Sequence, residues 1–123
     1  VLDLGCGEGD LMCRLIQDKN ANAEGIELDE NLVVHCVQRG LSVIHRDIER
    51  GLQMYPDETF DYAVLSQTIQ TLHDPQKVLL DLHRVAKKVI VVTEVRAITR
   101  SIEIMVANTG CQLHRIANGQ LDT

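Results

Sequence analysis

Three glycines close together near the start of the chain constrain its fold more than any other feature. They occur in the run Gly5-Cys6-Gly7-Glu8-Gly9, which follows the apolar run Val1-Leu2-Asp3-Leu4 and precedes a segment of helical periodicity from Asp10. Glycine permits a tight turn and lets a ligand approach the backbone without meeting a Cβ atom. We therefore expect a strand–turn–helix unit, whose turn either binds a ligand or has a purely structural role. The residues expected to form the ligand site are Asp3, Gly5, Cys6, Gly7 and Gly9.

Apolar runs and helical periodicities alternate along the rest of the chain. Further strands are expected at 25–28, 41–44, 60–65, 89–92 and 111–116, and further helices at 29–37, 75–85 and 100–108. This alternation predicts βαβ units, and therefore an α/β, Rossmann-like three-layer sandwich with a mostly parallel sheet between two layers of helices. In such sheets ligands bind beyond the carboxyl ends of the strands, beside the point where the strand order reverses.

Local signals place the starts and the buried faces of the helices. Asp29 is expected to cap the second helix, and Asp74 followed by Pro75 is expected to open the third. The first helix is expected to bury a face of Leu11, Cys13, Leu15 and Ile16. The third is expected to bury Val78, Leu79, Leu82 and Val85.

Length and composition restrict the classes of function. A chain of 123 residues predicts a single domain, 1–123; because Val1 is not Met and lies inside an apolar run, we expect a fragment of a longer protein. The net charge of −6 and an aromatic content of 2% argue against a nucleic-acid partner. No run is apolar enough to enter a membrane. Four cysteines without paired spacing indicate reduced thiols and a cytoplasmic location.

Acidic residues follow the second and third strands at the edge where a ligand is expected. Glu27, followed by Leu28, ends the second strand 18 residues after Gly9. That offset favours a carboxylate that binds the two hydroxyls of a ribose, and the alternative is a solvated acid near a helix N-terminus. Asp47 and Ile48 follow the third strand, where the residues alone leave Asp47 open between a binding role and an ordinary loop acid.

The glycine spacing distinguishes between two classes of cofactor. The dinucleotide fingerprint Gly-x-Gly-x-x-Gly requires a third glycine at position 10, where this chain has Asp10. An NAD-binding oxidoreductase is therefore the less favoured alternative. The observed Gly-x-Gly-x-Gly, with an acid two residues before it, resembles motif I of class I S-adenosylmethionine-dependent methyltransferases.

A family resemblance extends from Val1 to about Val92. Besides the glycine turn it rests on Gly25-Ile26-Glu27 and, most specifically, on the run Phe60-Asp61-Tyr62-Ala63-Val64-Leu65-Ser66-Gln67-Thr68-Ile69-Gln70. These segments resemble the methionine-biosynthesis protein MetW family, a branch of the class I methyltransferase-like proteins. The chain departs from the family at Thr93-Glu94-Val95-Arg96. We therefore expect the fold to lack the segment that precedes the first strand and part of the final antiparallel hairpin.

The resemblance implies a cofactor site and two functions. S-adenosylmethionine, or S-adenosylhomocysteine, is the implied cofactor, with Asp47 accepting a hydrogen bond from its adenine amino group and Ile48 in contact with the base. Ser66 and Gln67 are implied to face the methyl group and a small-molecule acceptor. One implied function is methyl transfer to a small molecule. The other is partnership with homoserine O-acyltransferase, which MetW proteins accompany in methionine synthesis.

No residue is assigned a catalytic role from the sequence. Methyl transfer from a sulfonium is a single in-line displacement that needs alignment, and it needs a base only when the acceptor must lose a proton. His73 lies near the expected site and is either that base or an exposed residue of a helix start. The other histidines lack metal-ligand spacing, so no metal is expected.

Overall fold

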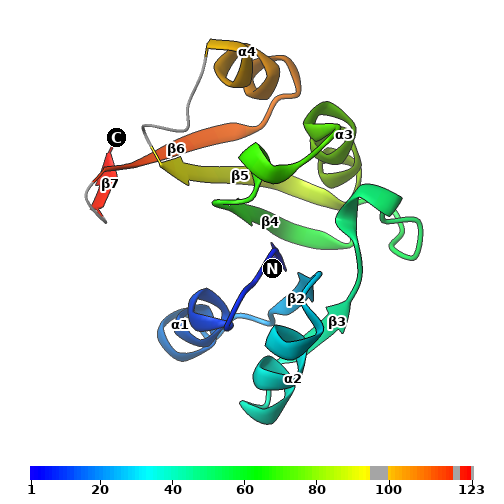
Figure 1. Ribbon diagram of the computed structural model, residues 1–123, viewed down its shortest axis with the longest axis vertical. Helices are drawn as coiled ribbons and strands as arrows, with labels where there is room; N and C mark the ends of the chain where they lie inside the picture. Colours follow the sequence, from blue (N-terminus) through cyan, green and yellow to red (C-terminus); the bar gives the residue numbers. More distant parts are fainter. Residues whose placement is uncertain (95–99, 118–119, 123) are drawn as a thin grey trace.

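The computed structural model describes residues 1–94, 100–117 and 120–122 and is built on one sheet, which has seven strands within these ranges (Figure 1). The strands are β1 (Leu2–Leu4), β2 (Glu24–Glu27), β3 (Ser42–His45), β4 (Phe60–Ser66), β5 (Ala86–Glu94), β6 (Gln112–Ala117) and β7 (Gln120–Asp122). Their order is β3-β2-β1-β4-β5-β6-β7. The first six strands are parallel to one another, and β7 runs antiparallel to β6. The α/β class and the mostly parallel sheet are thus confirmed.

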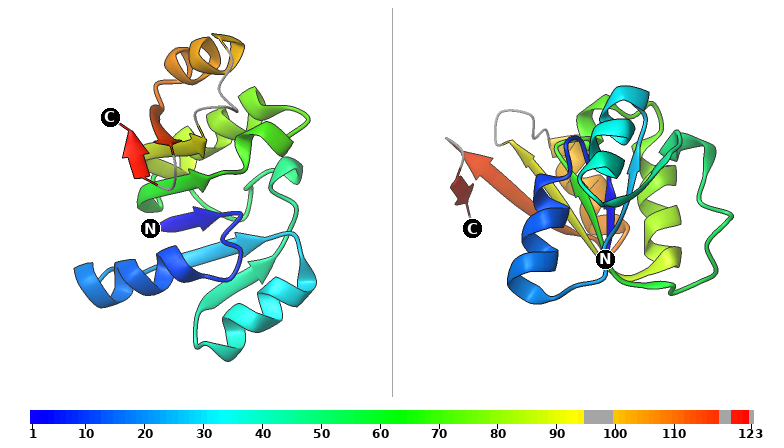
Figure 2. Two further views of the ribbon diagram at one scale, coloured as in Figure 1. Left: turned by 60° about the vertical axis from the view of Figure 1, so that its left-hand side comes forward. Right: turned by 90° about the horizontal axis from the view of Figure 1, so that it is seen from below.

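Four α-helices connect the described strands: α1 (Asp10–Lys19), α2 (Glu30–Gln38), α3 (Pro75–Val85) and α4 (Arg100–Asn108). Two short 3₁₀ helices, η1 (Ile48–Arg50) and η2 (Ile69–Thr71), follow β3 and β4. Figure 2 shows α1 and α3 on opposite sides of the sheet, which gives the expected three layers. In the described ranges no helix is long and apolar enough to cross a membrane.

The strand order reverses between β1 and β4. From β1 the chain moves outward through β2 to β3 and then returns to place β4 on the other side of β1. The carboxyl ends of β1 and β4 therefore lie next to each other at the centre of the sheet, and the chain leaves them in opposite directions. This is the position at which doubly wound sheets bind their ligands.

The sheet separates two apolar clusters. The larger contains Leu4, Leu65 and Val91 from the strands together with Leu79 of α3 and Val106 of α4. The smaller consists of Cys6, Met12, Cys36, Leu41 and Val43 and joins α1 and α2 to the opposite face. All four cysteines lie within the described residues and carry free thiols.

The expected helix starts are confirmed, and so is the buried face of α3. The Asp29 side chain accepts a hydrogen bond from Asn31 N, and that of Asp74 accepts one from Lys77 N. Pro75 is the first residue of α3. The residues of α3 that are buried are Val78, Leu79, Leu82 and Val85.

The buried face expected for α1 is wrong at Leu11 and Ile16, whereas Cys13 and Leu15 are half-buried and Cys13 packs against the smaller apolar cluster. Leu11 and Ile16 are 37% and 40% exposed, whereas Met12 is fully buried. The reason lies in β2, where Gly25 has no side chain and leaves room for the Met12 thioether; a Cβ at Gly25 would lie 2.7 Å from Met12 Sδ. The helix is therefore rotated so that Met12 points at the sheet.

Several element boundaries also differ from the expectation. The second strand ends at Glu27, so Leu28 lies outside it. The strand expected at 89–92 spans Ala86–Glu94 and begins directly after α3. The short β7 was not expected from the sequence. Of the segment where the chain departs from the family, Val95 and Arg96 lie outside the described residues.

Candidate functional site

The glycine turn joins β1 to α1 through left-handed backbone conformations. Gly5 and Gly7 have φ values of +67° and +57°, which residues with a side chain rarely adopt. A Cβ at Gly5 would also lie 2.5 Å from the hydroxyl oxygen of Thr68, in the segment that follows β4. Gly5 is therefore required for the close approach of two segments at the centre of the sheet.

The Glu27 carboxylate at the tip of β2 is turned inward and is only 9% exposed. Its Oε1 accepts a hydrogen bond from Gly7 N at 2.9 Å, and its Oε2 accepts one from Asp29 N at 2.8 Å. The carboxylate thereby ties the glycine turn to the start of α2. Because each carboxylate oxygen has two lone pairs, both oxygens retain capacity to accept a bond from a ligand hydroxyl.

Asp3 is a buried acid with an unsatisfied oxygen. It is 2% exposed, and its Oδ1 has no hydrogen-bond partner. Burial, and secondarily the charge of Glu27, raises the pKa of Asp3 to about 7 from an ordinary value of 3.8. A buried polar atom without a partner is costly, so this oxygen marks a place where a cationic or hydrogen-bond-donating group would stabilise the fold.

Asp47 lies at the tip of β3 and caps η1. Its Oδ1 accepts a hydrogen bond from Glu49 N at 3.0 Å, which fixes the carboxylate at the start of that helix. Among the described residues no hydrogen bond reaches its second oxygen, which is therefore available to a donor. Ile48 follows and is buried in the larger apolar cluster.

The segment after β4 has a strained residue. Gln67 has a φ value of +52°, and its N–H donates to Val92 O at 2.6 Å. Thr68 donates its hydroxyl to Ser66 O at 2.8 Å. A residue other than glycine in this conformation costs energy and occurs often at functional sites. Gln67 is exposed and follows the last residue of β4.

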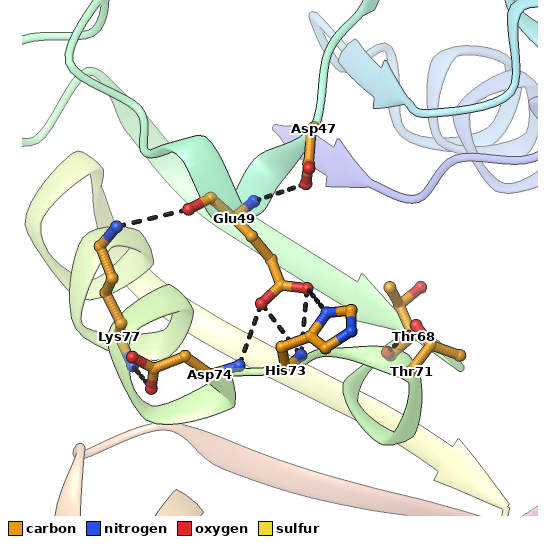
Figure 3. A network of polar contacts seen from close by, with 7 residues as sticks. All are labelled: Asp47, Glu49, Thr68, Thr71, His73, Asp74 and Lys77. Carbon is orange, nitrogen blue, oxygen red and sulfur yellow. Dashed lines mark hydrogen bonds and ion pairs between the residues drawn. The ribbon is translucent and has the colours of Figure 1, made fainter.

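The structure adds Glu49 to the site and joins it to His73, which is exposed (Figure 3). The Glu49 carboxylate accepts hydrogen bonds from His73 N at 2.9 Å and Asp74 N at 3.0 Å, and its Oε1 lies 3.0 Å from His73 Nδ1. These bonds lower the pKa of Glu49 to about 2, and the bond from the backbone N–H of His73 has the largest effect. The only sequence feature that could have drawn attention to Glu49 is its place two residues after Asp47. Its hydrogen-bond partner His73 is 24 residues further along the chain, so the contact itself could not be predicted.

A cavity of about 390 Å³ lies at the carboxyl ends of the strands. The predicted site residues that line it are Gly5, Glu27, Leu28, Asp47, Ile48 and Gln67. The other residues that line it are Ile26, Arg46, Glu49, Thr68, Thr71, Leu72 and His73. The predicted residues outside this lining are Asp3, Cys6, Gly7, Gly9 and Ser66, of which Gly7 contacts the lining residue Glu27.

A larger hollow of about 1120 Å³ lies over Val1, Ile16, Tyr62 and Ile90. It is an open depression against the sheet, and none of the predicted site residues lines it. The smaller cavity has the glycine turn, the inward carboxylate and the switch point of the strand order. We therefore assign the candidate site to the smaller cavity.

Strand order, glycine turn and inward carboxylate together define a Rossmann-like fold of the class I methyltransferase type. A SAM-dependent methyltransferase from Aquifex aeolicus is similar with a TM-score of 0.70 and 20% identity, over 95% of this chain and 72% of that one. The [4+2]-cyclase SpnF is similar with a TM-score of 0.62 and 27% identity, over 71% of this chain and 34% of that one. The fold thus occurs in proteins with different activities.

The family follows from the sequence comparisons. Residues 1–97 match the model of the methionine biosynthesis protein MetW, and the chain belongs to this family. It is also 31% identical over 100 residues to the bifunctional methionine biosynthesis protein MetXA/MetW of Rhodopirellula baltica. That match covers 74% of this chain and 16% of the relative, so the chain spans a small part of the fused protein.

Proposed function

We propose that this protein binds S-adenosylmethionine or S-adenosylhomocysteine in the cavity of about 390 Å³ and acts as a small-molecule methyltransferase of MetW type. The observation that carries the proposal is the Glu27 carboxylate, held between Gly7 N and Asp29 N at the wall of the cavity. A carboxylate so fixed is pre-oriented for two vicinal hydroxyls, and its position at the tip of β2 is that of a ribose-binding acid.

The remaining residues fit the other parts of such a cofactor. Asp47 would accept the adenine amino group on its second oxygen, with Ile48 and Leu28 as apolar neighbours of the base. The amino-acid moiety of the cofactor carries an ammonium, which matches the unsatisfied oxygen of Asp3. When bound, the cofactor supplies an electrophilic methyl group on sulfur.

Two residues after β4 are proposed to face the reacting centre. Ser66 ends the strand, and Gln67, which follows it with a positive φ, lines the cavity. Their polar groups would orient an acceptor for in-line displacement. We assign neither a role as a base.

Calorimetric titration with S-adenosylhomocysteine tests the proposal. Wild-type protein is expected to bind, and Glu27→Ala is expected to bind about 10- to 100-fold more weakly, because it loses bonds to ribose and the fixed position of the turn. Glu30→Ala, which removes an exposed acid of the first turn of α2, is the matched control and should bind as wild type does. Wild-type affinity in Glu27→Ala would remove that residue from the site.

A second function, as a non-catalytic partner of homoserine O-acyltransferase, is supported by a specific observation. The relative from Rhodopirellula baltica is named as a bifunctional MetXA/MetW protein, so in it a MetW portion belongs to a longer chain with a second activity. Co-purification with the acyltransferase and a change in its rate would support this function. The absence of both would count against it.

The NAD-binding alternative is distinguished by ligand-induced stabilisation. A ligand that binds only the folded state raises the melting temperature. We expect S-adenosylhomocysteine to raise it and NAD to leave it unchanged. The reverse result would favour a dinucleotide cofactor.

A further inference from the structure

The backbone of Gly7 is held on both its N–H and its carbonyl side by side chains of other elements. The N–H donates to Glu27 Oε1 at 2.9 Å, and the carbonyl oxygen accepts the thiol of Cys36 at 3.1 Å. Cys36 belongs to α2 and is fully buried. The Cys6 thiol is farther from the same oxygen, at 4.0 Å. The orientation of the turn beside Glu27 therefore depends on Cys36, which is not among the residues that line the cavity.

A second side chain of α2 binds the next carbonyl of the turn. Arg39 caps the C-terminus of α2, three residues after Cys36 and so on the same side of the helix. Its Nη1 donates to Glu8 O at 2.7 Å and to Asp10 Oδ1 at 2.9 Å. Hydrogen bonds from a charged guanidinium are stronger than those between neutral groups. Arg39 therefore joins the turn, and the first residue of α1, to the end of α2.

The turn lies directly against the C-terminal half of α2. A Cβ at Gly9 would lie 3.2 Å from Cys36 Sγ and would collide with the side chain of Leu41, which follows the helix. At the other end of α2, Glu27 Oε2 accepts the N–H of the N-cap residue Asp29. Both ends of α2 are thus joined to the turn, and a shift of the turn away from the helix would break bonds at each end.

We infer that Cys36 and Arg39 are positioning residues for the candidate site, because they hold the carbonyl side of the glycine turn so that the Gly7 N–H meets the Glu27 carboxylate. This inference rests on the proposed function, in which that carboxylate binds the ribose. A carboxylate that is fixed before the ligand arrives loses less conformational freedom on binding, so the affinity is higher. Neither residue lines the cavity, and each acts through Gly7 and Glu27.

The first measurement needs no ligand. Hydrogen exchange at the Gly7 amide, followed by nuclear magnetic resonance, reports how often its bond to Glu27 opens. We expect Cys36→Ala and Arg39→Ala to lower the protection of this amide about threefold to tenfold, the worth of one hydrogen bond. Cys36→Ser should restore it, because a hydroxyl also donates. Cys13→Ala is the matched control, since Cys13 packs against the same apolar cluster and its thiol has no hydrogen bond to the turn in the described part of the chain.

The second measurement is the affinity for S-adenosylhomocysteine by calorimetry. Cys36→Ala and Arg39→Ala should each bind about threefold to tenfold more weakly, and Cys36→Ser should bind nearly as wild type does. Arg14→Ala removes an exposed cation of α1 and controls for the loss of a charge. In a Glu27→Ala background, Cys36→Ala should weaken binding no further, because the carboxylate through which it acts is missing. A merely structural role would give independent losses that multiply.

Unfolding curves from circular dichroism verify that each variant is folded under the conditions of the measurements. If the protection of the Gly7 amide is unchanged in Cys36→Ala or in Arg39→Ala, the inference is overturned for that residue. If the losses of affinity from Cys36→Ala and Glu27→Ala multiply, it is overturned for Cys36. If S-adenosylhomocysteine does not bind wild-type protein, the proposed function fails, and the exchange of the Gly7 amide alone decides whether the two residues hold the turn.

Discussion

The Oε1 atom of Glu27 lies 2.9 Å from the backbone nitrogen of Gly7, so the tip of β2 holds the turn that follows β1. The two residues are 20 positions apart and meet because β1 and β2 are adjacent parallel strands. The same carboxylate accepts Asp29 N at the start of α2. One side chain therefore determines the shape of two segments at the candidate site.

Loss of this carboxylate should destabilise the fold as well as weaken ligand binding. Glu27→Ala leaves two half-buried N–H groups without their charged acceptor, and we expect the free energy of unfolding to fall by about 2–4 kcal/mol. Urea denaturation monitored by circular dichroism measures this change. Glu30→Ala should lie within about 0.5 kcal/mol of wild type. Equal stability of the two variants would show that the Glu27 bonds contribute nothing to the fold.

The raised pKa of Asp3 predicts that the stability of the fold depends on pH. Its folded-state pKa of about 7 is above its ordinary value of 3.8, so the folded protein holds a proton that the unfolded chain releases. The free energy of unfolding should therefore decrease as the pH rises from about 4 to about 7 and reach a plateau above that range, a total effect of at most about 4 kcal/mol.

Asp3→Asn removes the ionisable group and should abolish this dependence. At about pH 8 we expect the variant to be more stable than wild type by about 1–3 kcal/mol, because the neutral amide avoids burial of a charge. Binding of S-adenosylhomocysteine should weaken in the same variant, since its ammonium loses a carboxylate. Urea denaturation across the pH range measures the free energy of unfolding. If that free energy varied with pH in Asp3→Asn as it does in wild type, the pH dependence would have to come from another group.

Much of the fold could be predicted because its determinants are local. The glycine turn, the Asp29 and Asp74 caps and the β-branched run of β5 each act over a few residues, and all were found from the sequence. The rotation of α1 could not be found this way. It depends on the absence of a side chain at Gly25, which becomes a neighbour of Met12 only when β2 pairs with β1.

The candidate site shows the same division. Residues at strand ends, such as Glu27 and Asp47, could be predicted as site residues because a parallel sheet brings all carboxyl ends to one edge. The contact of Glu49 with His73 joins two loops across the switch point, and no periodicity or spacing reports such a contact. The unsatisfied oxygen of Asp3 is likewise a property of packing and not of sequence.

The lowered pKa of Glu49 predicts that the fold loses stability at acidic pH. Its folded-state pKa of about 2 is below the ordinary value of 4.5, so its bonds to the N–H groups of His73 and Asp74 stabilise the fold above about pH 4.5. This contribution is lost as the pH falls toward 2. Glu49→Gln should therefore be less stable than wild type at neutral pH, and the two should converge at about pH 2. A constant difference between their unfolding curves at all pH values would contradict the assignment.

Gly5 and Gly7, two of the three glycines in the turn that follows β1, should respond differently to the same substitution. Both have positive φ, so alanine at either position incurs about 1–2 kcal/mol of backbone strain. At Gly7 a Cβ meets nothing within 4 Å, whereas at Gly5 it lies 2.5 Å from the Thr68 hydroxyl oxygen. We expect Gly7→Ala to cost only the strain and Gly5→Ala to cost at least about 1 kcal/mol more, through displacement of Thr68.

The additional cost at Gly5 can be assigned to Thr68 by a double-mutant cycle. Thr68→Ala removes the hydroxyl that the new Cβ would meet, so Gly5→Ala should be less destabilising in that background, whereas Gly7→Ala should cost the same in both. Free energies of unfolding from urea denaturation supply the four corners of each cycle. Equal coupling of Thr68 to both glycines would contradict the close approach of the two segments, which is the geometry that shapes the wall of the cavity.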